Sequence, residues 1–361
     1  MKKKVLICPL DWGIGHATRC VPVIRLFLEA GYEVLLGADG RAYDFLHLEF
    51  PGLQIIRFPG TKIRYSKKGR SGLKIFFQFP RFFSGINKEH RFLKKLIHDY
   101  PVDIIVSDNR YGVWDKRIFS VLITHQLEPK LPKGAVFFSG ILRNFMNHQF
   151  ALYDECWIPD FENHLGLAGK LSHTRKPVIN SFYIGHLSRF EGLTTAGELT
   201  GMPVNDILFM ISGPEPQRSV FEEIIFSQVR TSGLKAIIVR GITERSDAFD
   251  LSESCRVYSH LGTNEMLRCI LQSEFIISRP GYSSIMDIVT LGKKAIFIPT
   301  PGQTEQEYLA KYLMVKKIYF SMEQRSFDLI YALEMSRNYP GMVIHNDFAV
   351  LRERINRIMN I

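Results

Sequence analysis

The sequence lacks the features of a disulfide-bonded protein and of a membrane-spanning one. Its five cysteines are odd in number, scattered and without a C-x-x-C pair, so neither a disulfide scaffold nor a zinc site is expected. No run approaches the roughly 18 apolar residues that a transmembrane helix needs, and the apolar run behind the basic start is short for a signal peptide. We expect a cytoplasmic protein that is soluble or peripheral on the inner face of the cytoplasmic membrane.

Short repeats and low-complexity tracts are also missing, and the composition is that of a globular protein. The 361 residues are 46% hydrophobic and 23% charged, which suits two domains. Lys and Arg number 46 against 36 Asp and Glu, giving a net charge of +10. This excess favours an anionic partner, which could be a phosphorylated small molecule, an acidic membrane face or nucleic acid.

Short apolar runs alternate with amphipathic stretches in both halves of the chain. The expected strands are 4–10, 33–39, 53–59, 102–108 and 120–127, then 206–212, 235–241, 255–260, 274–280 and 294–300. Strands separated by helices indicate parallel βαβ units. We therefore expect an α/β fold of two Rossmann-like, doubly wound parallel-sheet domains facing a central cleft. Their expected bounds are 1–188 and 189–361, with a linker in the Gly/Thr-rich segment 185–203 and a last helix that can pack back on the first domain.

Ligands of open parallel sheets bind at the carboxyl ends of the strands, so the turns found there are the candidate sites. "GIGHATRC" at 13–20 follows the first strand, and Gly13 and Gly15 permit close backbone approach to a ligand. His16 at the helix start is a candidate base, or a residue that only hydrogen-bonds the turn. Thr18 replaces the third glycine of a dinucleotide fingerprint, which argues against nicotinamide binding.

The turns of the second half carry the residue types of a nucleotide site. Ser212 and Gly213 directly follow a strand and suit a phosphate nest. In "SRPGYSS", Arg279 can neutralise phosphate, and Gly281, Ser283 and Ser284 bring backbone and hydroxyl donors to a helix start. Asp287 could hold a ribose diol, and Glu305 and Gln306 could bond sugar hydroxyls. Taken singly, each of these residues also fits an ordinary capped helix.

Residues 61–95 interleave Lys and Arg with six Ile and Phe side chains between residues 75 and 83. Such a segment suits an anionic membrane surface or single-stranded nucleic acid. The alternative is that its aromatic rings pack into the first domain.

These motifs together resemble GT-B glycosyltransferases, and most of all glycosyltransferase family 28, which contains the lipid-linked GlcNAc transferase of peptidoglycan synthesis. The best match is "SRPG…D…G…A.FIP…EQ…YLA" within 278–310. "GIGH" at 13–16, "THQ" at 124–126, "IGHLSR" at 184–189 and "SHLGTNEM" at 259–266 match more loosely.

The resemblance implies a role for each matching residue. Arg279, Ser283 and Ser284 would contact the donor diphosphate. Asp287 stands where the family has a ribose-binding Glu. Gln306 and Glu305 would contact the donor sugar, although Glu307 replaces the second of the family's paired glutamines. The remaining substrate-binding residues implied are Gly13, Gly15, His125, Gln126, Arg189, Ser212, Gly213, His260, Leu261, Gly281 and Tyr282.

The implied reaction transfers a sugar from a UDP-sugar such as UDP-GlcNAc to the hydroxyl of a glycan or lipid-linked acceptor, with inversion, in cell-envelope or glycoconjugate synthesis. His16 or Asp108 would be the catalytic base, and no metal, cofactor or nucleic acid would take part. Two alternatives stay open: a UDP-sugar 2-epimerase of the same fold, and a nucleic-acid-binding protein that uses 61–95.

Overall fold

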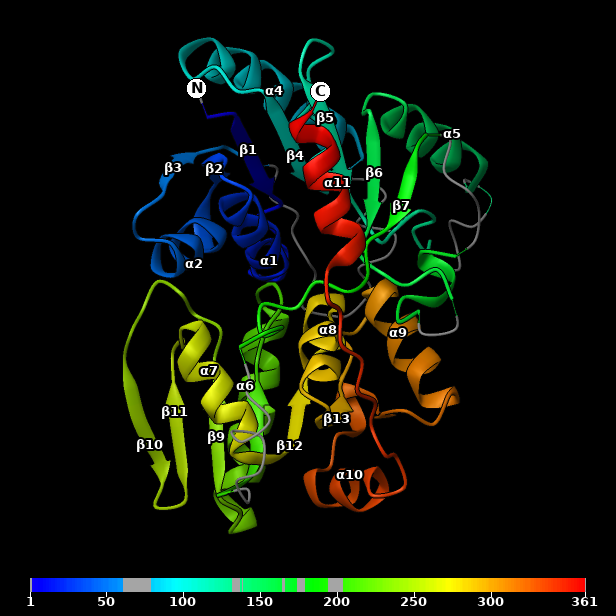
Figure 1. Ribbon diagram of the computed structural model, residues 1–361. Helices are drawn as coiled ribbons and strands as arrows, with labels where there is room; N and C mark the ends of the chain where they lie inside the picture. Colours follow the sequence, from blue (N-terminus) through cyan, green and yellow to red (C-terminus); the bar gives the residue numbers. More distant parts are fainter. Residues whose placement is uncertain are drawn as a thin grey trace. The chain divides into compact units, whose positions relative to one another are not determined.

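The computed structural model describes residues 2–60, 79–131, 137, 139–163, 166–173, 179–193 and 204–360, with the side chains of 79–82 excepted. The chain forms two compact units (Figure 1). The second runs from Phe190 to His345, and the first ends at Arg189 and takes up the chain again at Asn346. Residues 61–78 of the basic aromatic segment and 194–203 of the expected linker lie outside the described residues.

The first unit is built on a parallel sheet of strand order β3-β2-β1-β4-β5-β6-β7. Its strands are β1 (Lys4–Pro9), β2 (Glu33–Ala38), β3 (Gln54–Arg57), β4 (Ile104–Asp108), β5 (Phe119–Ile123), β6 (Glu155–Ile158) and β7 (Ser181–Tyr183). Its helices are α1 (Gly15–Glu29), α2 (Gly40–Glu49), α4 (Phe79–Asp99), α5 (Ser139–Phe150) and α11 (Ala349–Met359).

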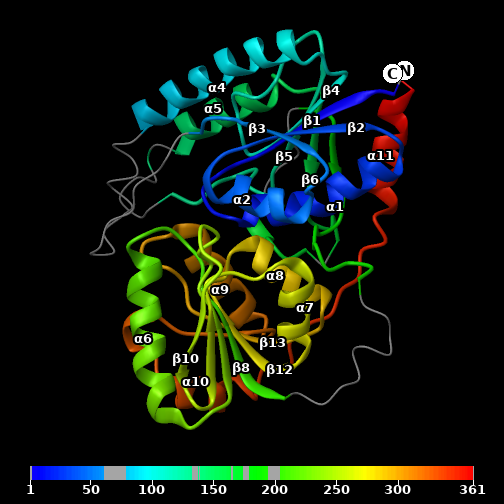
Figure 2. The same cartoon turned by 90° about the vertical axis from the view of Figure 1, so that its left-hand side faces the viewer.

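Helices cover both faces of this sheet, which explains why its central strands are apolar throughout. Figure 2 shows α4 and α5 on one face and α1 and α2 on the other. Leu93 and Leu96 of α4 pack into one buried cluster with Leu6 and Cys8 of β1. Strands buried on both faces read as continuous apolar runs, and this is the pattern that made β1, β2 and β4 predictable.

The C-terminal helix α11 belongs to the first unit and is held there by a buried ion pair. Arg354 of α11 bonds the carboxylate of Glu155, and both side chains are almost fully buried. The guanidinium of Arg354 lies 3.8 Å from the ring centroid of Phe182, and the indole Nε1 of Trp157 donates to Glu155 at 2.8 Å. Since a buried carboxylate without a partner is costly, these contacts tie the helix to the ends of β6 and β7.

The second unit has a sheet of order β10-β11-β9-β8-β12-β13-β14. Its strands are β8 (Asn205–Met210), β9 (Ala236–Val239), β10 (Ala248–Ser252), β11 (Cys255–Tyr258), β12 (Ser273–Ser278), β13 (Lys294–Phe297) and β14 (Phe320–Ser321). Its helices are α6 (Gln217–Ser232), α7 (Thr263–Leu271), α8 (Tyr282–Thr290), α9 (Thr304–Val315) and α10 (Leu329–Ser336). Strand β10, which the sequence did not predict, pairs antiparallel with β11.

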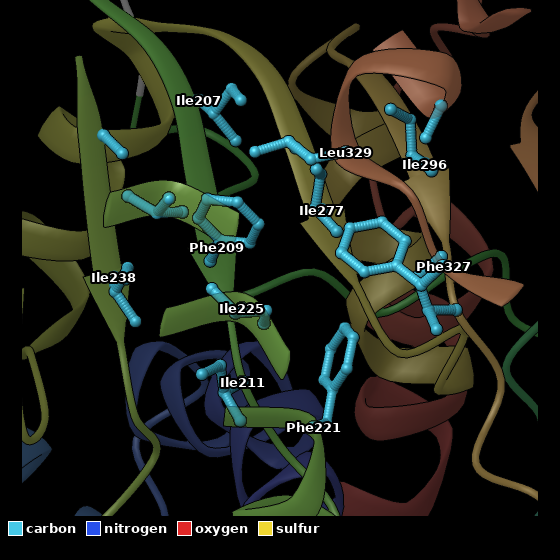
Figure 3. Packing of buried hydrophobic residues seen from close by; sticks show 14 of the residues in the cluster. Ile207, Phe209, Ile211, Phe221, Ile225, Ile238, Ile277, Ile296, Phe327 and Leu329 are labelled. Carbon is cyan, nitrogen blue, oxygen red and sulfur yellow. The ribbon is translucent and has the colours of Figure 1, made fainter. Parts of the chain in front are cut away.

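The core of the second unit is a dense cluster of aliphatic and aromatic side chains (Figure 3). Phe209 of β8 and Ile277 of β12 lie in it with Phe221 of α6 and Phe327. The rings of Phe221 and Phe327 meet edge to face, with centroids 6.0 Å apart. Packing of this kind fixes α6 against the strands whose carboxyl ends carry the candidate donor turns.

In each sheet the strand order reverses direction at one point. The reversal falls between β1 and β4 in the first sheet and between β8 and β12 in the second. At such a point the connections leave toward opposite faces and open a crevice at the carboxyl ends of the strands. The turns after these four strands are therefore where each unit is expected to bind its ligand.

Candidate functional site

The turn after β1 brings His16 to the order reversal of the first sheet. Gly13 in this turn has φ +134°, a conformation that favours glycine, and α1 begins at Gly15. On the neighbouring strand, Asp108 pairs in register with Pro9 at the end of β1. The two side chains meet, with Nδ1 of His16 3.0 Å from Oδ1 of Asp108.

Arg19, one turn further along α1, binds the same carboxylate. Its Nε donates to Oδ2 of Asp108 at 2.6 Å and its Nη2 donates to Oδ1. Nη1 of Arg19 lies 3.0 Å from Nδ1 of His125, and the thiol of Cys20 donates to Oδ2 of Asp108 at 3.5 Å. Arg19, Asp108 and His125 are all buried, so the cluster is an interior ion pair with a histidine on each side.

The charges of the cluster set the protonation state of its members. Burial alone would raise the pKa of Asp108, but the charges of Arg19 and His16 and their hydrogen bonds hold that pKa well below its ordinary 3.8. Burial and then the Arg19 charge lower the pKa of His16 below its ordinary 6.5, and Asp108 opposes them only in part. At neutral pH, therefore, Asp108 is ionised and His16 is neutral.

A neutral His16 that donates from Nδ1 to Asp108 carries its lone pair on Nε2. The side chain of His16 keeps 19% of its surface exposed while that of Asp108 has none. His16 is thus the member of the pair that a substrate can reach, and Asp108 acts on a substrate only through it. The arrangement can remove a proton from a hydroxyl group.

The other site residues predicted in the first unit differ in how far they are buried. Gly15 opens α1, and Gln126 follows His125 and is partly exposed. Arg189 is 3% exposed, with its guanidinium 5.5 Å from the ring centroid of Phe45. Its role as a substrate-binding residue stays a prediction.

The donor turns of the second unit follow β8 and β12. Gly213 has φ +107°, and a Cβ added there would lie 3.8 Å from Oγ1 of Thr300. Thr300 is 1% exposed, and within the described residues its hydroxyl has no hydrogen-bond partner. Small residues and a buried hydroxyl thus meet beside Ser212, which is partly exposed.

Helix α8 presents its first turn directly after β12. Gly281 is its N-cap, without a side-chain cap, and Tyr282 is buried while Ser283 and Ser284 are partly exposed. The free N–H groups of a helix start attract anions. Asp287, expected at a ribose, lies one turn on and is only 4% exposed.

The remaining candidate residues of the second unit follow β13 and β11, two strands that are not neighbours in the sheet. The side-chain Oε1 of Gln306 accepts from the backbone N–H of Thr300 at 2.8 Å, while Glu305 beside it is partly exposed. Glu307 accepts from the N–H of Gly302 at 2.7 Å, so this departure from the family pattern closes the turn after β13. His260 and Leu261 stand after β11, just before α7.

Arg279, expected at the donor diphosphate, lies in the interior of the second unit. It is 0% exposed, it donates to the carbonyls of Ile298 at 2.9 Å and Gln217 at 3.2 Å, and it bonds the side chain of Gln324. Its guanidinium also lies 4.1 Å from the ring centroid of Phe221. These contacts hold α6 to the segments that follow β13 and β14, and the diphosphate contact stays a prediction.

Three residues of these sites were not predicted from the sequence. The sequence could have indicated Arg19, because it follows His16 by three residues and so lies on the same helix face. Thr300 had none beyond its place after a strand. Asn109 adopts φ +55° directly after Asp108, and within the described chain its buried Oδ1 has no hydrogen-bond partner; strained residues of this kind gather at functional sites.

The chain is similar to known glycosyltransferases in sequence and in fold. Residues 243–336 match the glycosyltransferase family 28 C-terminal domain. Two uncharacterized glycosyltransferases, of Methanosarcina mazei and Methanosarcina acetivorans, are 24% and 21% identical over 85% of this chain and 82% of theirs. The fold resembles Arabidopsis thaliana UGT89C1 complexed with UDP-L-rhamnose (TM-score 0.59, 13% identity, 99% of this chain and 94% of that one). It also resembles Acinetobacter baumannii MurG (TM-score 0.56, 12% identity, 98% and 99%).

The chain is a glycosyltransferase with the GT-B fold. The match to the family 28 C-terminal domain lies within its second unit, and the two sheets are the two Rossmann-like halves that the sequence predicted.

Two further observations concern the described parts of this glycosyltransferase. They contain no group of three or more His, Cys, Asp and Glu side chains arranged to hold a metal ion. Nor does any helix within them have the length and apolar character needed to cross a membrane.

The Asp108 ion pair predicts a specific pH dependence of stability. Because the folded-state pKa of Asp108 is depressed, its contribution is complete above the unfolded pKa of about 4 and is lost as the pH falls toward the folded value. Asp108→Asn should lower the free energy of unfolding by about 3 kcal/mol at pH 7, and the gap from wild type should narrow below about pH 4. Urea unfolding from pH 3 to 7 measures it. The exposed Asp99→Asn is the control, and a gap that does not change with pH would contradict the assignment.

Proposed function

We propose that this glycosyltransferase moves a sugar from a UDP-sugar, with UDP-GlcNAc as first candidate, to an acceptor hydroxyl with inversion. The observation that carries the proposal is the His16–Asp108 pair, 3.0 Å apart at the order reversal of the first sheet. We assign acceptor activation to the first unit and donor binding to the second. The UDP-L-rhamnose complex of a protein with the same fold supports the choice of UDP.

The proposed chemistry is a single displacement. The acceptor oxygen forms a bond to the anomeric carbon while the bond from that carbon to the diphosphate oxygen breaks. The hydroxyl proton passes to Nε2 of His16, and UDP leaves with the electron pair. Attack opposite the leaving group inverts the anomeric centre, and Asp108 stabilises the imidazolium that forms on His16.

The proposed donor site uses the turns after β8 and β12. The N–H groups and hydroxyls of Ser283 and Ser284 at the start of α8 would receive the diphosphate, with the close backbone approach that Gly213 permits. Such donors can stabilise the leaving group without a metal ion. Asp287 is proposed for the ribose, the backbone near His260 for the uracil, and the turn of Glu305 and Gln306 for the sugar.

The acceptor is proposed to be a glycan or a lipid-linked sugar presented at an anionic membrane. Helix α4 carries exposed cations at 88, 91 and 95, a spacing that places them on one helix face. Phe83 near its start meets Phe145 of α5 with ring centroids 4.9 Å apart. Phe83, Phe137 and Ile141 expose 42%, 76% and 68% of their surface. Exposed rings beside a basic stripe are what an interfacial surface needs.

A panel of sugar nucleotides tests the donor. UDP-sugars should raise the melting temperature, because a ligand at a hundredfold excess over its Kd stabilises the folded protein by about 2.7 kcal/mol. GDP-, TDP- and ADP-sugars and NAD should leave the melting temperature unchanged. Ser284→Ala should raise the Kd for the UDP-sugar about tenfold. Ser227→Ala, which replaces an exposed serine within α6, should leave this Kd unchanged. Stabilisation by NAD alone would refute the proposal, and UDP release with formation of a free epimeric sugar would favour the epimerase.

Substitution of His16 tests the base. With the best donor of the panel and a set of free and lipid-linked sugars as acceptors, His16→Gln should lower kcat by about 10²- to 10⁴-fold and leave UDP binding unchanged. His98→Gln, an exposed histidine of α4, should keep full activity. The wild-type rate should fall only below pH 6.5, because the pKa of His16 is depressed. Full activity of His16→Gln would remove His16 from the reaction.

Vesicle binding tests the membrane proposal. The protein should sediment with phosphatidylcholine vesicles that contain phosphatidylglycerol and not with phosphatidylcholine alone. Replacing Lys88, Arg91 and Lys95 by Ser should reduce this binding, since each cation near the surface contributes about 1 kcal/mol. The matched triple change of Lys311, Lys316 and Lys317 on and after α9 should leave it intact. Equal losses in both variants, or binding to oligonucleotides in place of vesicles, would contradict the proposal.

A further inference from the structure

The buried guanidinium of Arg19 links two histidines of the first unit, His16 and His125. Arg19 directs Nε and Nη2 to the carboxylate of Asp108 and Nη1 to Nδ1 of His125 at 3.0 Å. His16 meets the other side of the same carboxylate, with Nδ1 3.0 Å from Oδ1. The order in space is therefore His16, Asp108, Arg19, His125.

The chemistry of the linking groups fixes where each ring carries its proton. A guanidinium only donates hydrogen bonds, so the Nδ1 of His125 that meets Arg19 has to be an acceptor, and the proton of a neutral His125 lies on Nε2. An ionised carboxylate only accepts, so Nδ1 of His16 has to be a donor, and its lone pair lies on Nε2. The two histidines are thus held in opposite tautomers.

We propose that Arg19 is a positioning residue that sets these opposite tautomers: His16 with a basic Nε2 and His125 with a donating Nε2–H. Its catalytic consequence rests on the proposed function, in which His16 takes the acceptor proton. In that reaction Arg19 acts only through the two rings.

Other buried arginines of the same unit show that this arrangement is more than an interior ion pair. Arg354 bonds Glu155 and lies over the ring of Phe182. Arg110 bonds Glu89 and the carbonyl of Pro59. Within the described residues neither of them bonds a histidine, whereas Arg19 directs Nη1 to His125.

Arg19 also sets the basicity of His16 through its charge. The charged and titratable groups that face His16 are Arg19 on α1, Asp108 on β4 and His125 after β5. The Arg19 cation offsets the Asp108 anion, and after burial it is the largest cause that lowers the pKa of His16. Removing the cation would leave the anion to act on His16 alone, and the pKa of His16 would rise.

The test reads the tautomers directly. The full chain is labelled with ¹⁵N-histidine, and long-range ¹H–¹⁵N spectra at neutral pH report which ring nitrogen is protonated. His16→Gln and His125→Gln assign the two sets of signals. Wild type should give the Nδ1–H form of His16 and the Nε2–H form of His125. The Nε2–H form of His16 or the Nδ1–H form of His125 would overturn the proposal without any variant.

Two substitutions then test Arg19 itself. In Arg19→Met, the His125 signals should shift to a mixture of tautomers and the His16 titration should move to higher pH, together with the acid limb of the rate profile. Arg19→Lys keeps the positive charge but loses the branched guanidinium that reaches both Asp108 and His125. It should restore the wild-type titration of His16 and leave His125 as a mixture of tautomers. Arg354→Met, which breaks a buried pair elsewhere in the unit, should lower stability and leave both histidines as in wild type.

The outcomes separate a structural role from a positioning role. If Arg19→Met folds and both histidines keep their wild-type signals, Arg19 is only structural and the proposal fails. If that variant does not fold, the wild-type tautomers and Arg19→Lys decide. If the tautomers are as expected but no sugar transfer is found with any donor, the proposed function fails while the assignment of Arg19 stands.

Discussion

The buried ion pair between Arg19 and Asp108 is the interaction on which the first unit's site depends. A carboxylate with no exposed surface is tolerated only when its charge is matched and its oxygens are bonded, and the fork of Arg19 does both. Asp108 ends β4 and Arg19 lies on the helix that follows β1, so the pair also joins the two strands at the order reversal. His16 is placed against this fixed anion and stays at the surface.

The two units carry different residue types at the point where the strand order reverses. In each, the reversal of strand order leaves a crevice at the carboxyl ends of two neighbouring strands. The first fills this edge with ionisable side chains that can move a proton. The second places Gly213, the buried hydroxyl of Thr300 and the start of α8 there, which carry N–H and O–H groups. The proposed division between acceptor activation and donor binding follows from that difference.

The sequence predicted what depends on local periodicity and missed what depends on distant partners. Strand β8 (Asn205–Met210) falls on the predicted 206–212, because its run of apolar residues is continuous. Strands β7 and β14 are three and two residues long, too short to carry a pattern. Arg279 was expected at a ligand from its residue type, but only packing decides that it turns inward. Arg19 was missed because its partner Asp108 lies 89 residues away.

His16 is a weak base because the charge of its partner Asp108 is already neutralised by Arg19. This weak basicity limits the kind of reaction that His16 can assist. The charge of Arg19 lowers the pKa of His16. His16 is therefore in its neutral, proton-accepting form at neutral pH, but its protonation releases less free energy than that of an ordinary histidine. Such a base suits a reaction whose barrier lies mainly in the departure of the leaving group, with an oxocarbenium-like transition state at the sugar. Deprotonation of the acceptor then need not run ahead of bond cleavage. A nucleoside diphosphate is a leaving group of this kind, so the weak basicity of His16 agrees with the donor class proposed for the turns of the second unit.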